Sequence, residues 1–115
     1  MATQHPRLDF VQGDTWKIYG RMQDDRGLVL DVSTLIPSIH WVLTTESRTN
    51  VINGSGSTVS AVDADQGDIL ITVAEGVTED VPPGRYTDYC WIDMPDGRRT
   101  KWFGEIFVHA GPPGP

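Results

Sequence analysis

The side chains most able to do chemistry in this sequence are carboxylates, and their densest run is Asp63-Ala64-Asp65-Gln66-Gly67-Asp68. A calcium-binding loop needs oxygen ligands at its first, third and fifth positions, a glycine at the sixth and an acid at the twelfth. Here the fifth position is Gly67, the sixth is Asp68 and the twelfth is Ala74. Because the match fails at these positions, we interpret the run as an acidic turn before a strand and expect no metal site.

The other reactive side chains form no catalytic pattern. His5, His40 and His109 stand far apart, without the spacing of metal ligands. The single cysteine, Cys90, falls on the inward side of a predicted strand, where a buried thiol is inert. The sequence contains no Gly-x-Ser-x-Gly elbow, P-loop or dinucleotide fingerprint. We therefore predict that the chain is not an enzyme and has no cofactor.

Length and charge limit the function further. A chain of 115 residues is long enough for one domain with a single core. The 16 acidic and 9 basic residues give a net charge of −7, which argues against a nucleic-acid partner. Neither a signal peptide nor an apolar run of membrane-spanning length is visible. We therefore expect a partner that is neither nucleic acid nor membrane.

The elements that must position these side chains are short strands, because apolar residues recur with a period of two. Turn signals rich in Gly, Pro and Asp separate them about every ten residues. We predict strands at Asp14 to Met22, Leu28 to Val32, Ser38 to Thr45, Thr58 to Val62, Asp68 to Val73, Arg85 to Met94 and Arg99 to His109. The pattern predicts an all-β, antiparallel β-sandwich with about seven to nine short strands. We expect one domain over residues 1–110 and a flexible Gly/Pro tail over 111–115.

The turn Pro95-Asp96-Gly97 fixes the register of the last hairpin. It suits a three-residue loop in which Gly97 takes the left-handed conformation. The predicted pairs are then Asp93 with Arg99, Trp91 with Lys101, Tyr89 with Phe103, and Arg85 with Phe107. This register places Asp88 on the core side opposite Gly104, and the space beside the glycine is the only reason that the sequence offers. A two-residue Asp-Gly loop would pair Asp88 with Glu105, and we reject it.

Four aromatic side chains share the outward face of this hairpin. They are Tyr89, Trp91, Phe103 and Phe107. A contiguous aromatic patch on a small domain usually marks a contact surface, and we predict a protein interface here. The alternative is a second layer of the same chain, such as the segment around Phe10, that covers the patch.

Two further stretches have a predicted role. Asp63 to Asp96 holds nine carboxylates and one base, Arg85. It could dock a basic partner, but we favour a solvated surface. In Pro83-Gly84-Arg85-Tyr86, Gly84 allows a tight entry and Tyr86 starts a long core strand. The step indicates a tyrosine corner, in which the hydroxyl bonds to a nearby loop backbone.

The order of these landmarks resembles a known family. Phe10-Val11-Gln12-Gly13-Asp14-Thr15 precedes the first long strand, Pro83-Gly84-Arg85-Tyr86 opens the next-to-last one, and Gly104-Glu105-Ile106-Phe107-Val108 lies in the last. The sequence, from about Leu8 to Val108, is similar to the immunoglobulin-like N-terminal domain of phage baseplate upper proteins and related phage tail proteins. In that family a Phe-x-Gln-Gly-Asp opening, a Pro-Gly-x-Tyr step and a Gly-x-Ile-x-Val strand recur in this order.

The resemblance implies an immunoglobulin-like sandwich with a structural role in a phage or prophage particle. Family members continue into a long helical or receptor-binding region, whereas this sequence stops after Pro115, so we expect a stand-alone or accessory domain. The implied location is the virion, in the tail or baseplate, after assembly in the host cytoplasm. The implied partners are other particle proteins or further copies of the chain. The alternative function is a carbohydrate- or host-surface-binding module, because outward aromatic rings suit sugar stacking.

Overall fold

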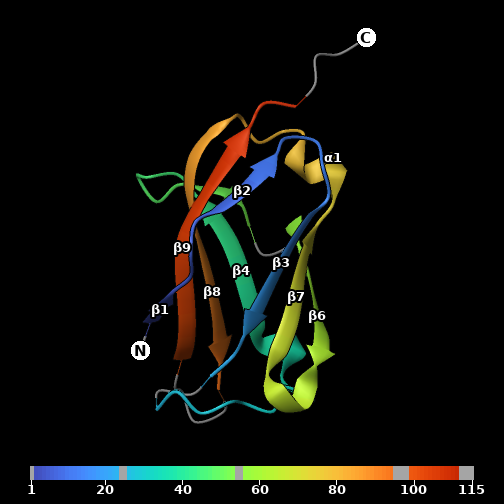
Figure 1. Ribbon diagram of the computed structural model, residues 1–115, viewed down its shortest axis with the longest axis vertical. Helices are drawn as coiled ribbons and strands as arrows, with labels where there is room; N and C mark the ends of the chain where they lie inside the picture. The colour runs from blue at the N-terminus through green and yellow to red at the C-terminus, as the bar shows by residue number, and fades with distance from the viewer. Residues whose placement is uncertain (1, 24–25, 54–55, 95–98, 112–115) are drawn as a thin grey trace.

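The computed structural model describes residues 2–23, 26–53, 56–94 and 99–111 as two β-sheets packed against each other (Figure 1). The larger sheet has the order β1-β9-β8-β4-β5, and β2 also pairs with β9. Its strands are β1 (Ala2–Gln4), β2 (Leu8–Val11), β4 (Ile39–Thr44), β5 (Asn50–Ile52), β8 (Gly84–Asp93) and β9 (Arg99–His109). The smaller sheet has the order β3-β7-β6, with β3 (Trp16–Arg21), β7 (Asp68–Val73) and β6 (Thr58–Asp63). The predicted all-β sandwich is confirmed.

Short helical turns join some of these strands. They are the 3-10 turns η1 (Ile36–Ser38) and η3 (Ala64–Gln66), and the single-turn helix α1 (Glu75–Thr78). Pro37 lies inside η1, where its missing N–H costs no strand pairing. Because these helical elements are only three or four residues long, the strands position most of the side chains considered below.

The core lies between the sheets because every second residue of each long strand points inward. Trp16 of β3 and Trp41 of β4 are fully buried there, as are Ile71 of β7, Ile92 of β8 and Ile106 of β9. Full burial of such a side chain stabilises the fold by roughly 1.5–3 kcal/mol. The inward faces predicted for β3 and β4 are therefore confirmed.

The predicted register of the β8–β9 hairpin is also confirmed. Tyr89 lies opposite Phe103, Trp91 opposite Lys101, and Asp88 opposite Gly104. The predicted turn at Pro95-Asp96-Gly97 lies outside the described residues. The two strands are 10 and 11 residues long, and they lie in the larger sheet between β1 and β2 on one side and β4 on the other.

The strand predicted at Leu28 to Val32 is wrong. Leu28 and Val29 are exposed whereas Val32 is buried, so the segment presents no continuous strand face to the core. Its backbone makes an isolated bridge between Gln23 and Val29, and Val32 N–H donates to the Ala64 carbonyl at 2.9 Å. The segment is a loop that backbone hydrogen bonds to Met22 and Ala64 hold at the end of the smaller sheet.

Three strands were not predicted. β1 and β2 both run parallel to β9, with Ala2 opposite Lys101 and Leu8 opposite Ile106. β5 is three residues long and pairs with the end of β4. Each is too short to show a period of two, and the parallel partners lie at the other end of the sequence.

Candidate functional site

The four predicted aromatic residues lie together on the outward face of the larger sheet. Tyr89 and Trp91 project from β8, and Phe103 and Phe107 project from β9, each half-buried. The Tyr89 and Phe103 rings stack with centroids 6.4 Å apart. We call these four residues the aromatic face. Long, fully paired strands hold it, so its geometry is set before any partner arrives.

The N-terminal segment covers the aromatic face only at its edge. The Phe10 ring stacks on core residue Trp16, with centroids 5.2 Å apart, and so belongs to the core. The Arg7 guanidinium lies over Phe107, with Cζ 4.7 Å from the ring centroid. All four aromatic residues keep some exposed surface, so the N-terminal segment does not form a second layer over the whole face.

Charged groups border the aromatic face at the end formed by β2 and β9. Asp9 Oδ1 accepts a hydrogen bond from Arg7 Nη2 at 2.9 Å and lies 3.0 Å from His109 Nε2. The hydrogen bonds from His109 and Arg7 lower the pKa of Asp9. Glu105 Oε1 lies 3.6 Å from Arg85 Nε. Exposed pairs of this kind add little to stability, but they can orient a partner.

A buried polar cluster lies on the other side of the same strands. Asp88 of β8 is fully buried, and its Oδ2 accepts a hydrogen bond from Trp41 Nε1 at 2.9 Å. Its Oδ1 lies 2.5 Å from Nε2 of His5, which sits in the link between β1 and β2. Gly104 makes room for His5, because a Cβ on that glycine would overlap the imidazole. The cluster supplies the reason, missing from the sequence, for Asp88 opposite Gly104.

The geometry sets the charge of His5. Its Nδ1 lies 2.6 Å from the Pro6 carbonyl oxygen, and its Nε2 lies against the Asp88 carboxylate. Both oxygens only accept, so both ring nitrogens must carry a hydrogen and the ring is an imidazolium. Burial lowers the pKa of His5, but the hydrogen bonds to Asp88 and Pro6 and the charge of Asp88 raise it above its usual value.

The buried cluster fastens the N-terminal segment to the sheet. The His5 ring contacts the Asp88 carboxylate, the Pro6 carbonyl and the Trp102 ring. Cys90, two residues from Asp88 on the same core side, is fully buried, and burial with the Asp88 charge raises the pKa of its thiol. Asp88 thus joins the link between β1 and β2, through His5, to Trp41 of β4.

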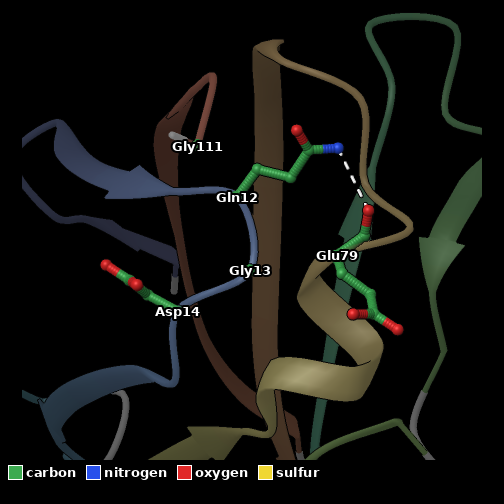
Figure 2. Close-up of a pocket in the computed structure, with 5 residues that line it drawn as sticks. All are labelled: Gln12, Gly13, Asp14, Glu79 and Gly111. Atoms are coloured by element: carbon green, nitrogen blue, oxygen red, sulfur yellow. Dashed lines mark hydrogen bonds between the residues drawn. The ribbon is translucent and has the colours of Figure 1, made fainter. Parts of the chain in front are cut away.

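Figure 2 shows the shallow pocket lined by Gln12, Gly13, Asp14, Glu79 and Gly111. Gln12 Nε2 donates to the Glu79 carbonyl at 3.1 Å, and the carboxylates of Asp14 and Glu79 point away from each other. Thr78 Oγ1 also donates to the Asp14 carbonyl at 2.6 Å. The Gln12-Gly13-Asp14 part of the opening motif is therefore a joint between the β2–β3 turn and α1.

The residues predicted as structural corners lie as follows. Gly84 has a φ of 153°, which a residue with a side chain rarely adopts. The Tyr86 hydroxyl donates to the Pro82 carbonyl at 2.5 Å, the bond expected of a tyrosine corner, and burial raises the pKa of Tyr86. Gly97 lies outside the described residues.

The acidic run at Asp63 to Asp68 forms the turn between β6 and β7. Gly67 has a φ of 72°, and a Cβ there would lie 2.5 Å from the Met22 carbonyl oxygen. Arg21 donates from Nε and Nη2 to the two carboxylate oxygens of Asp68, at 2.7 and 3.1 Å. The described residues contain no group of three or more His, Cys, Asp or Glu placed to hold a metal ion. Within the same residues, no helix has the length and apolar character needed to span a membrane.

Comparisons with known proteins bear on the fold alone. No protein-family model matches the sequence, and no curated protein matches it. InlP of Listeria monocytogenes is 15% identical with a TM-score of 0.56, over 94% of this chain and 27% of that chain. CopC of Methylosinus trichosporium OB3b is 12% identical with a TM-score of 0.50, over 94% of this chain and 89% of that chain. The second Ig domain of the mouse polymeric immunoglobulin receptor is 12% identical with a TM-score of 0.48, over 99% and 100%.

This chain thus spans about a quarter of the InlP chain that it matches. At these identities the likeness concerns architecture and carries no function. Together with the two-sheet topology, the likeness to InlP and CopC defines the class of the domain as an all-β sandwich.

Proposed function

We propose that this chain is a non-enzymatic assembly domain that binds another protein through its aromatic face. The observation that carries the proposal is the cluster of Tyr89, Trp91, Phe103 and Phe107 on the open side of the larger sheet. Aromatic side chains are enriched at the centres of protein interfaces, where a few of them supply most of the binding free energy.

The surroundings of the aromatic face fit a protein partner. The face lies on the flat surface of paired strands, and the ion pairs of Asp9 and Glu105 border it. An apolar centre inside a charged rim is the usual anatomy of a protein interface. Because long strands already fix the aromatic side chains, binding would cost little backbone ordering.

The resemblance to phage baseplate upper proteins and tail proteins supports a place for this domain in a phage particle. A tail or baseplate component acts by contact with neighbouring subunits, which is what an aromatic face can do. The proposed partners are accordingly other particle proteins or further copies of this chain, and the proposed location is the tail or baseplate.

Carbohydrate binding is the second candidate, and one observation favours it. The His40 and Trp91 rings lie 5.3 Å apart on the aromatic side of the sheet, and His40 Nε2 lies 3.4 Å from Asp93 Oδ2. A Trp ring beside polar groups can stack on a sugar and hydrogen-bond its hydroxyls.

The test of the proposed function is a binding measurement against purified tail and baseplate proteins encoded beside this gene. Trp91→Ala and Phe103→Ala should each weaken binding about tenfold or more, because they remove central aromatic contacts. Leu28→Ala, which truncates an exposed apolar side chain in a loop, is the matched control and should leave affinity unchanged. Unchanged affinity in both aromatic variants would overturn the proposal. Binding to a glycan array that Trp91→Ala abolishes would establish the second candidate.

A further inference from the structure

We propose that residues 2–5, which form β1 and the start of the link to β2, are a pH-sensitive strap on β9. The strap, as we call these residues, is closed while the His5 ring carries two protons. Loss of one proton loosens the strap from β9 without unfolding the two sheets. The His5–Asp88 contact that closes it lies on the inner side of β8, away from the aromatic face.

The closed strap needs both hydrogens of the His5 ring. Nε2 donates to the buried Asp88 carboxylate at 2.5 Å, and Nδ1 donates to the Pro6 carbonyl at 2.6 Å. A neutral ring has a single N–H, so one of the two oxygens would then face a nitrogen lone pair. Loss of a proton therefore costs His5 a hydrogen bond and leaves the buried Asp88 without its counter-ion.

Asp88 is the charged group that faces His5 from the packed strands. β9 contributes the Trp102 ring, which meets the imidazole edge to face with centroids 5.4 Å apart, and β4 contributes Trp41, whose Nε1 donates to Asp88. Cys90 of β8 is titratable, but burial and the charge of Asp88 raise the pKa of its thiol. Burial lowers the pKa of His5, whereas its hydrogen bonds and the charge of Asp88 raise it above its usual value.

The rest of the strap is weakly attached. It lies at the edge of the larger sheet, next to β9 (Figure 1). Its backbone pairs with β9 over three residues, from Ala2 opposite Lys101 to Gln4 opposite Phe103, and the His5 N–H donates to the Phe103 carbonyl at 2.9 Å. The Gln4 side chain is exposed. Short edge segments of this kind open locally at a low cost in free energy.

Strand β2, which follows the strap, is attached independently of His5. Leu8 and Phe10 pack against the core, and the Phe10 ring stacks on Trp16 with centroids 5.2 Å apart. Opening of the strap can therefore stop at Pro6, which has no backbone N–H that would need a partner in either state.

The cation next to this hinge is held outside the strap. Arg7 lies over the Phe107 ring and donates to Asp9 at 2.9 Å, so its charge lies on the outer side of the sheet. It does not take part in the His5–Asp88 contact, and the protonation of His5 alone sets how firmly the strap is closed.

The direction of the pH effect follows from the two states of the strap. The closed state holds the ring proton more tightly than the open state, in which the pKa of His5 returns to its ordinary value near 6.5. Closure is therefore strongest below about pH 6.5, weakens by up to about tenfold per pH unit above it, and stops weakening above the pKa of the closed state. Opening uncovers the β9 backbone at 101–103 and the space beside Gly104 that the imidazole fills.

Hydrogen–deuterium exchange of the wild-type chain measures this opening directly. After correction for the intrinsic exchange rate at each pH, the protection of the amides of residues 2–5 should fall by up to about tenfold per pH unit above about pH 6.5. Low concentrations of urea should leave this protection unchanged and lower that of β3 and β7, because local opening exposes little surface and global unfolding exposes much.

Two histidine variants show which ring is responsible. His5→Gln keeps a polar side chain without a charge, so residues 2–5 should exchange faster than in the wild type and with no pH dependence beyond the intrinsic one. His109→Gln is the matched control: it removes an exposed histidine, 3.0 Å from Asp9, and should keep the wild-type pH profile. Circular dichroism verifies that both variants are folded, and the wild-type series needs neither.

Three results would overturn the strap. The first is wild-type protection of residues 2–5 that stays constant or rises between about pH 6 and 8.5. The second is exchange of these residues with the same protection and urea dependence as β3 and β7, which would mean that they open only when the whole domain unfolds. The third is a pH profile that His109→Gln abolishes. None of these results bears on binding through the aromatic face, so the proposed function is tested separately.

Discussion

A histidine, a tryptophan and an aspartate lie together on each side of strand β8. The outer and the inner group differ in how far water reaches them. On the outer side His40 lies beside Trp91 and 3.4 Å from Asp93, with 40% and 49% of the His40 and Asp93 side chains exposed. On the inner side the His5–Asp88 distance is 2.5 Å, and the two side chains are 17% and 0% exposed. Water screens the outer pair and leaves it free to be remodelled by a partner. The inner pair is desolvated, so its partners must stay together.

Removal of the inner histidine should have the largest effect. His5→Ala leaves the buried Asp88 carboxylate without its cation, so the free energy of unfolding should fall by about 3–5 kcal/mol. The matched control is His40→Ala on the outer side, which should change it by less than about 1 kcal/mol. Urea unfolding followed by tryptophan fluorescence measures both. Equal effects of the two substitutions would show that burial does not distinguish the pairs.

A smaller loss should follow when the room for His5 is filled. Gly104→Ala places a Cβ where the imidazole lies, and such overpacking costs roughly 1–3 kcal/mol. The control is Gly76→Ala in α1, where a Cβ meets nothing within 4 Å, so alanine should be neutral or stabilising by up to about 1 kcal/mol. Thermal melts of the two variants test the difference. A Gly104→Ala variant as stable as the wild type would contradict the position of His5.

The contribution of the inner His5–Asp88 pair to the free energy of unfolding should also depend on pH. The pKa of His5 is raised in the folded state, so its contribution to stability is complete below the unfolded pKa of about 6.5 and is lost as the pH rises through the folded pKa. The stability difference between the wild type and His5→Gln should therefore shrink as the pH is raised from about 6. Urea midpoints over a pH series measure it. A difference that grows with pH would mean that His5 is buried neutral.

The smallest effect on stability is expected on the outer side. Trp91→Ala removes a half-buried ring from a solvated face, so we expect a loss of roughly 1 kcal/mol or less, together with the much larger loss of partner binding. Parallel melts and binding titrations on one protein preparation would reveal that split. A variant that loses stability and binding in proportion would place Trp91 in the structural framework.

The sequence predicts the outer side better than the inner side, for physical reasons. The Pro95-Asp96-Gly97 sequence predicts the β8–β9 register locally, and the period of two then assigns Tyr89 and Phe103 to one face, as the structure has them. The partner of Asp88 lies 83 residues away at His5, and no local pattern links the two. The sequence holds one indication of the contact: Gly104 lies opposite the inward-facing Asp88, and a glycine at such a position leaves space for a third side chain.

The N-terminal strands and the loop at Leu28 to Val32 also depend on contacts between residues far apart in the sequence, which no local pattern predicts. The pairing of β2 with β9 is parallel and joins opposite ends of the described chain, so only the tertiary fold selects it. The apolar run at Leu28 to Val32 has the composition of a strand, but backbone bonds to Met22 and Ala64 hold it as a loop. Propensity was overridden there by contacts distant in sequence.

Hydroxyl-radical footprinting tests most directly whether the aromatic face is the contact surface. The chain is footprinted as a dilute monomer and in its assembled state. We predict that Trp91 and Phe103 become several-fold less reactive on assembly, while the exposed loop residue Leu28 is oxidised at the same rate in both states. Equal oxidation of Trp91 and Phe103 before and after assembly would contradict the proposed role of the aromatic face.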